Sequence, residues 1–339
     1  MFTDQSSLPL SKKIGSFLAD NFIAIFLFLM IVVIAISEPS FISARVLRDL
    51  LLQNSTKLVM ASGVQFILIG GRADMSGGRS VGMAAIISAS LLQRADFGRL
   101  FFGRPLGIPL VVGMLIAVVF SILFGALNGI VITRLGVPPF ICTWGMQVLI
   151  YGVGSIYYTQ YPNNANPIGG VIPEFTQMGS GYVGPIPILT IFAVVCVAIS
   201  WLVLSRTQFG RNVYAAGGNR EAARVSGINT DAIDMAIYMI AGFVYGLTGC
   251  LEVARTGGAT NLYGNSYEFD AICACVVGGI SNSGGIGTIG GLIIGVFVFG
   301  VLNYGMTYIG ISPYYQLIMK GLIINAAVGV DVRKYRRLR

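Results

Sequence analysis

Long apolar runs alternate with short polar segments along almost the whole chain. A helix that crosses a bilayer needs about 20 mainly apolar residues, and ten runs approach that length. The runs near 55–70, 80–93 and 267–281 are short and flanked by glycine, which is typical of broken or re-entrant helices. The pattern predicts an all-α, polytopic membrane protein with about ten transmembrane helices in a single transmembrane domain, 1–339. The ten runs are 16–37, 55–70, 80–93, 108–133, 138–158, 187–205, 232–254, 267–281, 286–304 and 314–330.

The polar segments carry an orientation signal. Residues 159–186 contain no lysine or arginine and are rich in Pro, Asn and Gly, as expected of an external loop. Four arginines lie in 206–230 and a basic tail fills 331–339, so the positive-inside rule predicts that both are cytoplasmic. Retaining the first run as a span, with Lys12 and Lys13 inside, then places both termini in the cytoplasm. The three arginines between 94 and 104 oppose this scheme, but the other three signals outweigh them.

Five spans before the external loop and five after it would run in opposite directions. Inverted repeats of this kind are a common transporter architecture. Sequence similarity between the two halves is too weak to establish the repeat.

Composition supports the membrane assignment and excludes several function classes. Hydrophobic residues make up 55% of the chain and charged residues only 11%, whereas a soluble domain carries about 25% charged residues. The net charge of +8 lies mostly in loops and tail, so it indicates topology rather than nucleic-acid binding. The chain has no histidine, and its five cysteines lack metal-ligand spacing and are interpreted as packing residues.

The chain also lacks the P-loop pattern GxxxxGK[ST], so it is not expected to bind ATP by itself. Uphill transport would therefore draw its energy from an ion gradient or from another polypeptide. Enzymatic activity is not predicted, because no catalytic constellation is present.

One polar segment between two apolar runs is unusual. Residues 217–228, GGNREAARVSGI, are charged and helix-forming, although a turn between spans needs only a few residues. We interpret this segment as a small amphipathic element that something outside the membrane recognises.

Glycine spacing predicts close helix packing. Residues 285–290 match GxGxxG, but they follow no soluble strand, and no acidic residue follows at the required distance, so a dinucleotide site is disfavoured. Gly287, Gly291 and Gly295 instead recur every four residues, which lets two helix backbones approach closely in lipid. The pairs Gly125/Gly129 and Gly242/Gly246 predict the same packing in two other spans.

Polar groups within the apolar runs are candidates for a transport route. The glycine-rich segment 70–79 is either an ordinary cytoplasmic turn or a broken helix in which Asp74 and Arg79 pair and shape the route. The in-span amides could simply hold helices together, and the lysine could snorkel or meet a carboxylate. Together with aromatic faces they would suit a sugar. The candidates are Asp74, Arg79, Asn128, Trp144, Gln147, Asn303, Tyr304, Tyr308 and Lys320.

The segment at 217–228 also carries a family resemblance. Its residues, with 267–272, 278–281 and 284–288, resemble the membrane permeases of bacterial sugar ABC importers, in the ribose/galactose/xylose branch. The similarity extends from about residue 15 to 332. Within the branch, segments 74–82 and 303–310 most resemble the galactose/methyl-galactoside type.

The resemblance implies a type II ABC-importer permease of the bacterial inner membrane that forms a homodimer, with the sugar route near the dimer axis. Its further partners would be a periplasmic sugar-binding protein and a cytoplasmic ATPase with two nucleotide-binding cassettes. ATP and Mg would bind in that ATPase, with no cofactor in this chain. The segment at 217–228, within a cytoplasmic loop at 206–230, would be the coupling helix. Its coupling residues are Gly217, Gly218, Asn219, Arg220, Glu221, Ala222, Ala223, Arg224, Ser226 and Gly227.

The leading functional prediction is thus the permease subunit of an ATP-driven importer for galactose, methyl-galactoside or a similar aldohexose. Two alternatives remain at this point. One is a secondary sugar transporter driven by an ion gradient, and the other is a membrane enzyme acting on a lipid-linked sugar.

Overall fold

The computed structural model describes residues 31–36 and 38–336, so most of the predicted first span, 16–37, lies outside it. Residues 31–36 are helical. A 3₁₀ turn, η2, covers Pro39–Phe41. The helices that follow are α3 (Ala44–Ile69), α4 (Gly77–Leu91), α5 (Leu110–Arg134), α6 (Pro139–Thr159), α7 (Pro173–Ser180), α8 (Ile188–Arg206), α9 (Gln208–Gly218), α10 (Arg220–Val225), α11 (Thr230–Thr256), α12 (Tyr267–Val277), α13 (Ile289–Tyr308) and α14 (Pro313–Arg336).

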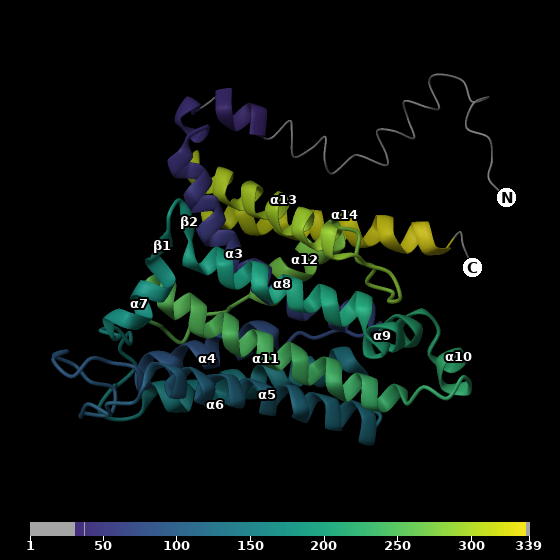
Figure 1. Ribbon diagram of the computed structural model, residues 1–339, viewed down its shortest axis with the longest axis horizontal. Coiled ribbons are helices and arrows are strands. Elements are labelled where there is room, and N and C mark those ends of the chain that lie inside the picture. Colours follow the sequence, from purple (N-terminus) through teal and green to yellow (C-terminus); the bar gives the residue numbers. More distant parts are fainter. Residues whose placement is uncertain (1–30, 37, 337–339) are drawn as a thin grey trace.

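The described chain is mostly helical, and the long helices lie side by side (Figure 1). Helix α7 and a hairpin of two short antiparallel strands, β1 (Tyr182–Val183) and β2 (Ile186–Pro187), lie at one end of the bundle. Helices α9 and α10 lie at the other end. The predicted external and cytoplasmic loops are therefore at opposite ends, as two sides of a membrane require.

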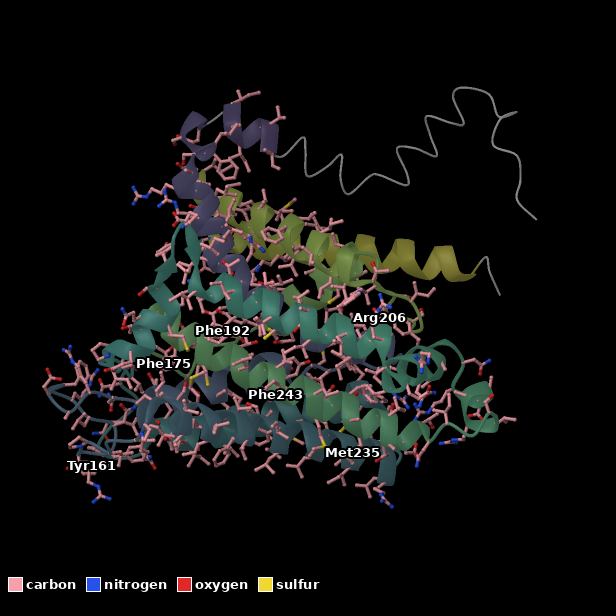
Figure 2. All side chains as sticks on the ribbon, in the orientation of Figure 1. Tyr161, Phe175, Phe192, Arg206, Met235 and Phe243 are labelled. Carbon is pink, nitrogen blue, oxygen red and sulfur yellow. The ribbon has the colours of Figure 1, made fainter. Side chains whose placement is uncertain are left out.

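Side-chain chemistry follows the same division. Figure 2 shows nitrogen and oxygen atoms gathered toward the two ends, with Tyr161 at the α7 end and Arg206 toward the α9 end. Arg94 and Arg99 lie at the α7 end, where they bond to Asp96 and to the carbonyl of Pro167. Local partners thus accompany two of the arginines that oppose the positive-inside assignment.

Five described helices are long and apolar enough to cross a membrane, namely α5, α6, α8, α11 and α13. The expected short runs at 80–93 and 267–281 appear as α4 and α12, of 15 and 11 residues. At 1.5 Å per residue neither spans a hydrocarbon core of about 30 Å. The run at 55–70 was wrongly predicted to be short. Its helix begins at Ala44, because a polar first segment with exposed Arg45 and Arg48 extends it beyond the apolar residues.

The two halves of the bundle repeat the same pairings. Helix α4 packs on α5 and α6, and α12 packs on α13 and α14 in the same way. Across the halves, α11 packs on α4 and α5, while α3 packs on α12 and α13. Arg72, just beyond the end of α3, meets Asp234, in the second turn of α11, so these two packed helices run antiparallel. These pairings are those expected of an inverted repeat.

Glycines set the closest helix contacts, as predicted for two of the three groups. A Cβ at Gly125 or Gly129 would meet α11, and one at Gly242 or Gly246 would meet α5. In α13, Gly291 and Gly295 lie against the backbone of Gly278 and Ala274 at the end of α12. Gly287 was wrongly placed in this series. It precedes α13, whose N-cap is Thr288, and lies against Ile69 and Ile280 side chains.

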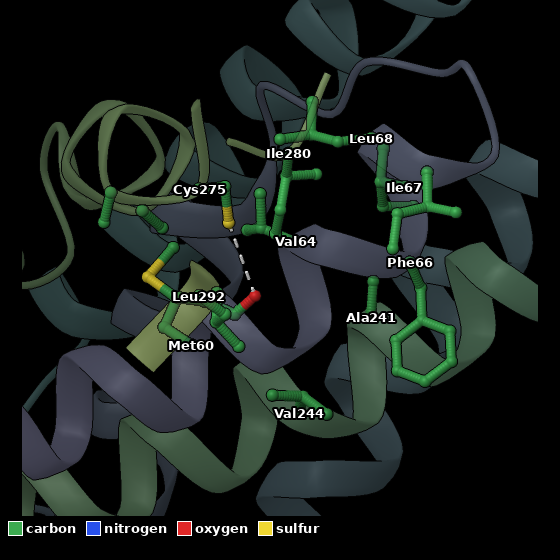
Figure 3. Close-up of a cluster of buried hydrophobic side chains, with 14 of the residues drawn as sticks. Met60, Val64, Phe66, Ile67, Leu68, Ala241, Val244, Cys275, Ile280 and Leu292 are labelled. Atoms are coloured by element: carbon green, nitrogen blue, oxygen red, sulfur yellow. Dashed lines mark hydrogen bonds between the residues drawn. The ribbon is translucent and has the colours of Figure 1, made fainter. Parts of the chain in front are cut away.

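The core forms where α3 meets α11, α12 and α13. Figure 3 shows Met60 and Val64 of α3 facing the cluster that contains Cys275 and Leu292. The Cys275 thiol donates to the carbonyl of Ala61 at 3.7 Å. Four of the five cysteines are buried and none forms a disulfide, so they act as small packing residues.

Candidate functional site: the cytoplasmic segment and the helix breaks

The segment predicted to be one coupling helix is two helices. Gly217 and Gly218 close α9, and the six-residue α10 begins after Asn219, whose side chain accepts from the amide of Ala222 at 3.0 Å. An asparagine that caps the next turn interrupts the helix, because its extended backbone leaves the helical region. Gly227 has a φ of +86° and follows the C-cap Ser226, so these two small residues end the helix.

Most of α10 is exposed. Ala223 is buried, whereas Ala222 and Val225 are exposed. Val225 is 89% exposed, an unusual position for a valine on a charged loop. Glu221 is exposed beside it and has no ion pair within the described residues. The result is a small surface of mixed apolar and acidic character at the bundle end.

The base of α10 is anchored by one buried carboxylate. Asp234 of α11 is 1% exposed and accepts from Arg220 at 2.6 Å and from Arg72 at 2.7 Å. Arg220 also reaches Asp231 at 3.2 Å. Burial by itself would lower the pKa of Arg220, but the hydrogen bonds and charges of Asp234 and Asp231 outweigh it and raise that pKa. The guanidinium therefore stays charged. This network, the Asp234 anchor, ties α10 to both α11 and the end of α3.

Glycine backbones bring a third segment into the same place. Gly217 lies directly on the carbonyl of Ile69, which also accepts from the amide of Gly285 at 2.8 Å. Gly284 and Gly285 have φ of +88° and +73°, a region that favours glycine. The Tyr214 hydroxyl donates to the carbonyl of Gly287 at 2.8 Å. The segment that holds α9 and α10 thus contacts the end of α3 and the loop that leads into α13.

These segments enclose an open hollow of about 550 Å³ at the bundle end. Its polar lining combines the α3–α4 turn with the junction of α9 and α10. The lining residues are Gly70, Gly71, Arg72, Ala216, Gly217, Gly218, Asn219, Arg220, Glu221 and Ser283.

The break between α3 and α4 is held by a buried polar cluster. Asp74 accepts from the amide and hydroxyl of Ser76 at 2.8 and 2.6 Å, and Asn128 of α5 donates to the same hydroxyl at 2.9 Å. The predicted pairing of Asp74 with Arg79 was wrong. Arg79 instead donates to Asn265 at 2.8 Å and lies 4.2 Å from the ring centre of Tyr151. It lies two residues into α4 and has turned away from the Asp74 cluster.

The start of α4 meets the start of α12 inside the bundle. Gly78 and Gly82 approach the backbone of Tyr263 and Gly264 so closely that a Cβ would clash at either glycine. A Glu268 oxygen also lies against Gly78. Glu268 is 1% exposed, and neither of its oxygens has a hydrogen-bond partner within the described residues. Short helices whose N-termini meet within a bundle are typical of transporter sites.

The remaining route candidates lie in separate places. Trp144 is 59% exposed on the outer face of α6, and Gln147 lies one turn further along that helix. Asn303 is buried, and its side-chain amide donates to the carbonyl of Phe299 in the same helix. Lys320 pairs with Asp270 at 2.8 Å, so the expectation that it meets a carboxylate is confirmed.

Two aromatic candidates on α13 pack against the start of the described chain. Tyr304 and Tyr308 stack on each other and contact Phe41. Within the described chain, the nine candidates thus fall in several separate groups.

Sequence reasoning missed the Asp234 anchor and a polar group in the outer half of α11. There Glu252 accepts from Thr56 at 2.6 Å and pairs with Arg255 at 2.7 Å, while Lys57 lies nearby on α3. A charged residue inside an apolar run was the signal that could have found this group. Lys57 and Glu252 both show it, as Lys320 does. Among the residues that the structure describes, no group of His, Cys, Asp and Glu side chains could hold a metal ion.

Comparisons with known proteins agree on the class. Residues 46–328 match the family described as the branched-chain amino acid transport system / permease component. The chain is 40% identical to the galactose/methyl galactoside import permease protein MglC of Escherichia coli (strain K12), covering 96% of this chain and 98% of the relative. It is 43% identical to the corresponding protein of Haemophilus influenzae, over the same shares.

A ribose import permease protein, RbsC of Bacillus subtilis (strain 168), is 35% identical, covering 95% of this chain and 94% of the relative. No solved structure matched. The relatives are import permeases rather than enzymes, and the resemblance to bacterial sugar permeases is confirmed. Because these matches span nearly the whole chain, it belongs to this family of membrane transport permeases.

Proposed function

We propose that this chain is the membrane-spanning subunit of an ATP-driven importer for galactose, methyl galactoside or a similar aldohexose. The observation that carries the proposal is identity of 40–43% with galactose/methyl galactoside import permeases over 96% of the chain. The apolar helices support a multi-pass position in a bacterial inner membrane. The arginines of 206–230 and the basic tail support cytoplasmic termini.

The energy would come from a separate ATPase that binds ATP and Mg, because this chain has no P-loop pattern. The exposed surface of α10 is the proposed contact. Val225 and Glu221 face outward there, whereas Arg220 is held by the Asp234 anchor. A partner that grips α10 would therefore pull on a rigidly attached element rather than on a loose loop.

The contacts of the cytoplasmic segment suggest how such a pull would reach the passage. The Asp234 anchor links α10 to α11 and α3, and the glycine contacts link α9 to the loop before α13. Closure of an ATPase pair would then rock these helices together as rigid bodies. The ends of α3 and α11 belong to opposite halves of the bundle, so both halves would move.

The remaining partners are a second copy of this chain and a periplasmic sugar-binding protein. The exposed apolar residues of α5, α6, α8 and α14 provide surface for lipid and for the second copy. The end that carries α7 and the β1–β2 hairpin is the proposed docking face for the binding protein.

Reconstitution separates this proposal from an ion-driven secondary transporter. The purified chain is placed in liposomes without an ATPase, and radiolabelled galactose uptake is measured under imposed Na⁺ and H⁺ gradients. We expect no accumulation until the ATPase, internal ATP and the binding protein are added. Gradient-driven accumulation by the chain alone would overturn the proposal.

A further inference from the structure

A cavity of about 250 Å³ lies inside the single chain, between α3, α11, α12 and α13. At about 30 Å³ per water molecule it has room for roughly eight waters, or for one small polar ring. It is distinct from the hollow beside α10 and from the Asp74 cluster. The lining residues are Gln53, Thr56, Lys57, Met60, Thr248, Glu252, Arg255, Tyr267, Asp270, Ala271, Ala274, Val296 and Phe299.

The cavity lies in the half of the bundle that faces away from α10. Its α3 residues lie around the middle of that helix, and Glu252 and Arg255 come from the last turns of α11. Tyr267 and Asp270 open α12. These helix ends lead toward α7 and the external loop (Figure 1). A solute delivered from outside would meet this cavity before it reached the cytoplasmic half.

Some polar groups of the lining are already engaged. Glu252 is fixed between Thr56 and Arg255, and Asp270 is paired with Lys320. These bonds hold the walls in place.

Other lining groups have free hydrogen-bonding capacity. Within the described residues, the ammonium of Lys57, the side-chain amide of Gln53 and the hydroxyl of Tyr267 form no hydrogen bond or ion pair. Polar groups within a membrane bundle are costly unless they find partners. Three such groups lining one cavity, two from α3 and one from α12, therefore indicate a polar occupant.

The charges and shapes of the lining specify what kind of occupant fits. Glu252 is paired with Arg255 and Asp270 with Lys320. Among the described residues, Lys57 is therefore the one charged lining residue left without an ion-pair partner, and its ammonium can donate hydrogen bonds to an occupant. Phe299 and Tyr267 add flat apolar faces. A neutral, hydroxyl-rich ring presents hydrogen-bonding edges and apolar faces together.

We propose that this cavity is a monosaccharide-binding site within each permease chain, on the path of the imported sugar. The inference rests on the proposed function for the sugar class. It differs from a passage formed only between two copies, because every lining residue belongs to one chain.

The test uses variants that remove hydrogen-bonding groups without breaking any bond that the structure shows. Gln53→Leu and Lys57→Met each remove one free group. Gln65→Leu is the matched control, since Gln65 lies on the same helix but outside the lining, and among the described residues its side chain donates only to Ser62 within that helix. Thermal unfolding confirms folding, and Tyr267→Phe replaces any variant that does not fold.

Binding of D-galactose to the permease alone, in nanodiscs, is measured by saturation-transfer NMR. One lost hydrogen bond to a sugar hydroxyl should weaken binding about tenfold for Gln53→Leu, and at least as much for the charged Lys57. The control should stay within about twofold of wild type. Uptake by the complete importer should show a raised KM in the two cavity variants.

The outcomes separate the two proposals. Wild-type affinity in both cavity variants, or no galactose binding to the wild-type permease, would overturn the cavity site even if the importer transports galactose. Binding that depends on Gln53 and Lys57, in a wild-type complex that does not import galactose, would support the cavity and overturn the proposed importer.

Discussion

Replacing Asp234 with asparagine should disconnect the cytoplasmic segment from the membrane helices. One carboxylate, 1% exposed, serves two guanidinium groups whose side chains are 18% and 25% exposed. Asparagine keeps the shape and one acceptor oxygen but removes the charge. Arg72 and Arg220 would then face each other with only Asp231 to compensate.

The size of the effect follows from this burial. Removing one partner of a fully buried ion pair costs about 3–5 kcal/mol. The two arginines are partly exposed here, so solvent screening reduces the cost to about 2–3 kcal/mol. At 1.36 kcal/mol per tenfold change, the anchored state of α10 would lose about 30- to 150-fold in relative population.

The assay is ATP hydrolysis stimulated by sugar-loaded binding protein, with galactose uptake measured in parallel. Asp234→Asn should lower both at least about tenfold. Arg220→Gln should do the same, because it cuts only the link to α10 and leaves Arg72 paired with Asp234. Asp231→Asn is the control on the same helix. Asp231 is half exposed, and its surface pair contributes less than about 1 kcal/mol.

Wild-type stimulation of ATP hydrolysis in both Asp234→Asn and Arg220→Gln would show that the Asp234 anchor does not couple α10 to the membrane helices. Equally strong uncoupling by the control Asp231→Asn would also contradict the role assigned to Asp234. Thermal unfolding of each variant shows whether lost stimulation reflects lost coupling or a lost fold.

Three further changes test other parts of the structure. Val225→Asp and Glu221→Arg should abolish stimulated ATP hydrolysis with no change in the unfolding midpoint. Val183→Asp, at an exposed valine of the hairpin, should leave stimulated hydrolysis unchanged. Gly291→Ala should destabilise the permease by about 1–3 kcal/mol, because its Cβ would meet the carbonyl of Gly278, whereas Gly290→Ala meets nothing and should not lower the unfolding midpoint. Lys320→Met should lower the unfolding midpoint, because it leaves Asp270 unpaired. The double variant Lys320→Met/Asp270→Asn should regain the midpoint, and no recovery would contradict the pairing.

The sequence predicted the features that depend on local pattern. Apolar runs located α5, α8 and α11 within a few residues, and the four-residue glycine spacing predicted close packing at α5 and at α11, though not that the two helices are each other's partners. The end of α10 at Ser226 and Gly227 followed from local backbone preferences. These properties need no knowledge of what lies across the bundle.

The features that were missed depend on long-range contacts. Arg72 and Asp234 are 162 positions apart, and Thr56 and Glu252 are 196 apart, so neither pair is visible in a local pattern. Trp144 looked suitable for a sugar route, but hydrophobicity alone does not tell a cavity wall from a lipid-facing surface. The Asp74 carboxylate accepts a hydrogen bond from Ser76, only two residues away, and does not pair with Arg79. Local hydrogen bonds of this kind compete with pairings predicted from charge.

The central claim is that the surface of α10 is where an ATPase drives this permease. A photo-reactive benzophenone amino acid placed at Val225 tests it directly in cells, with the same residue at Val183 as the comparison. We expect an adduct between the Val225 variant and a cytoplasmic polypeptide with two nucleotide-binding cassettes, and no such adduct from the Val183 variant. Capture of that ATPase from Val183, or its absence at Val225 in a complex that imports galactose, would contradict the account.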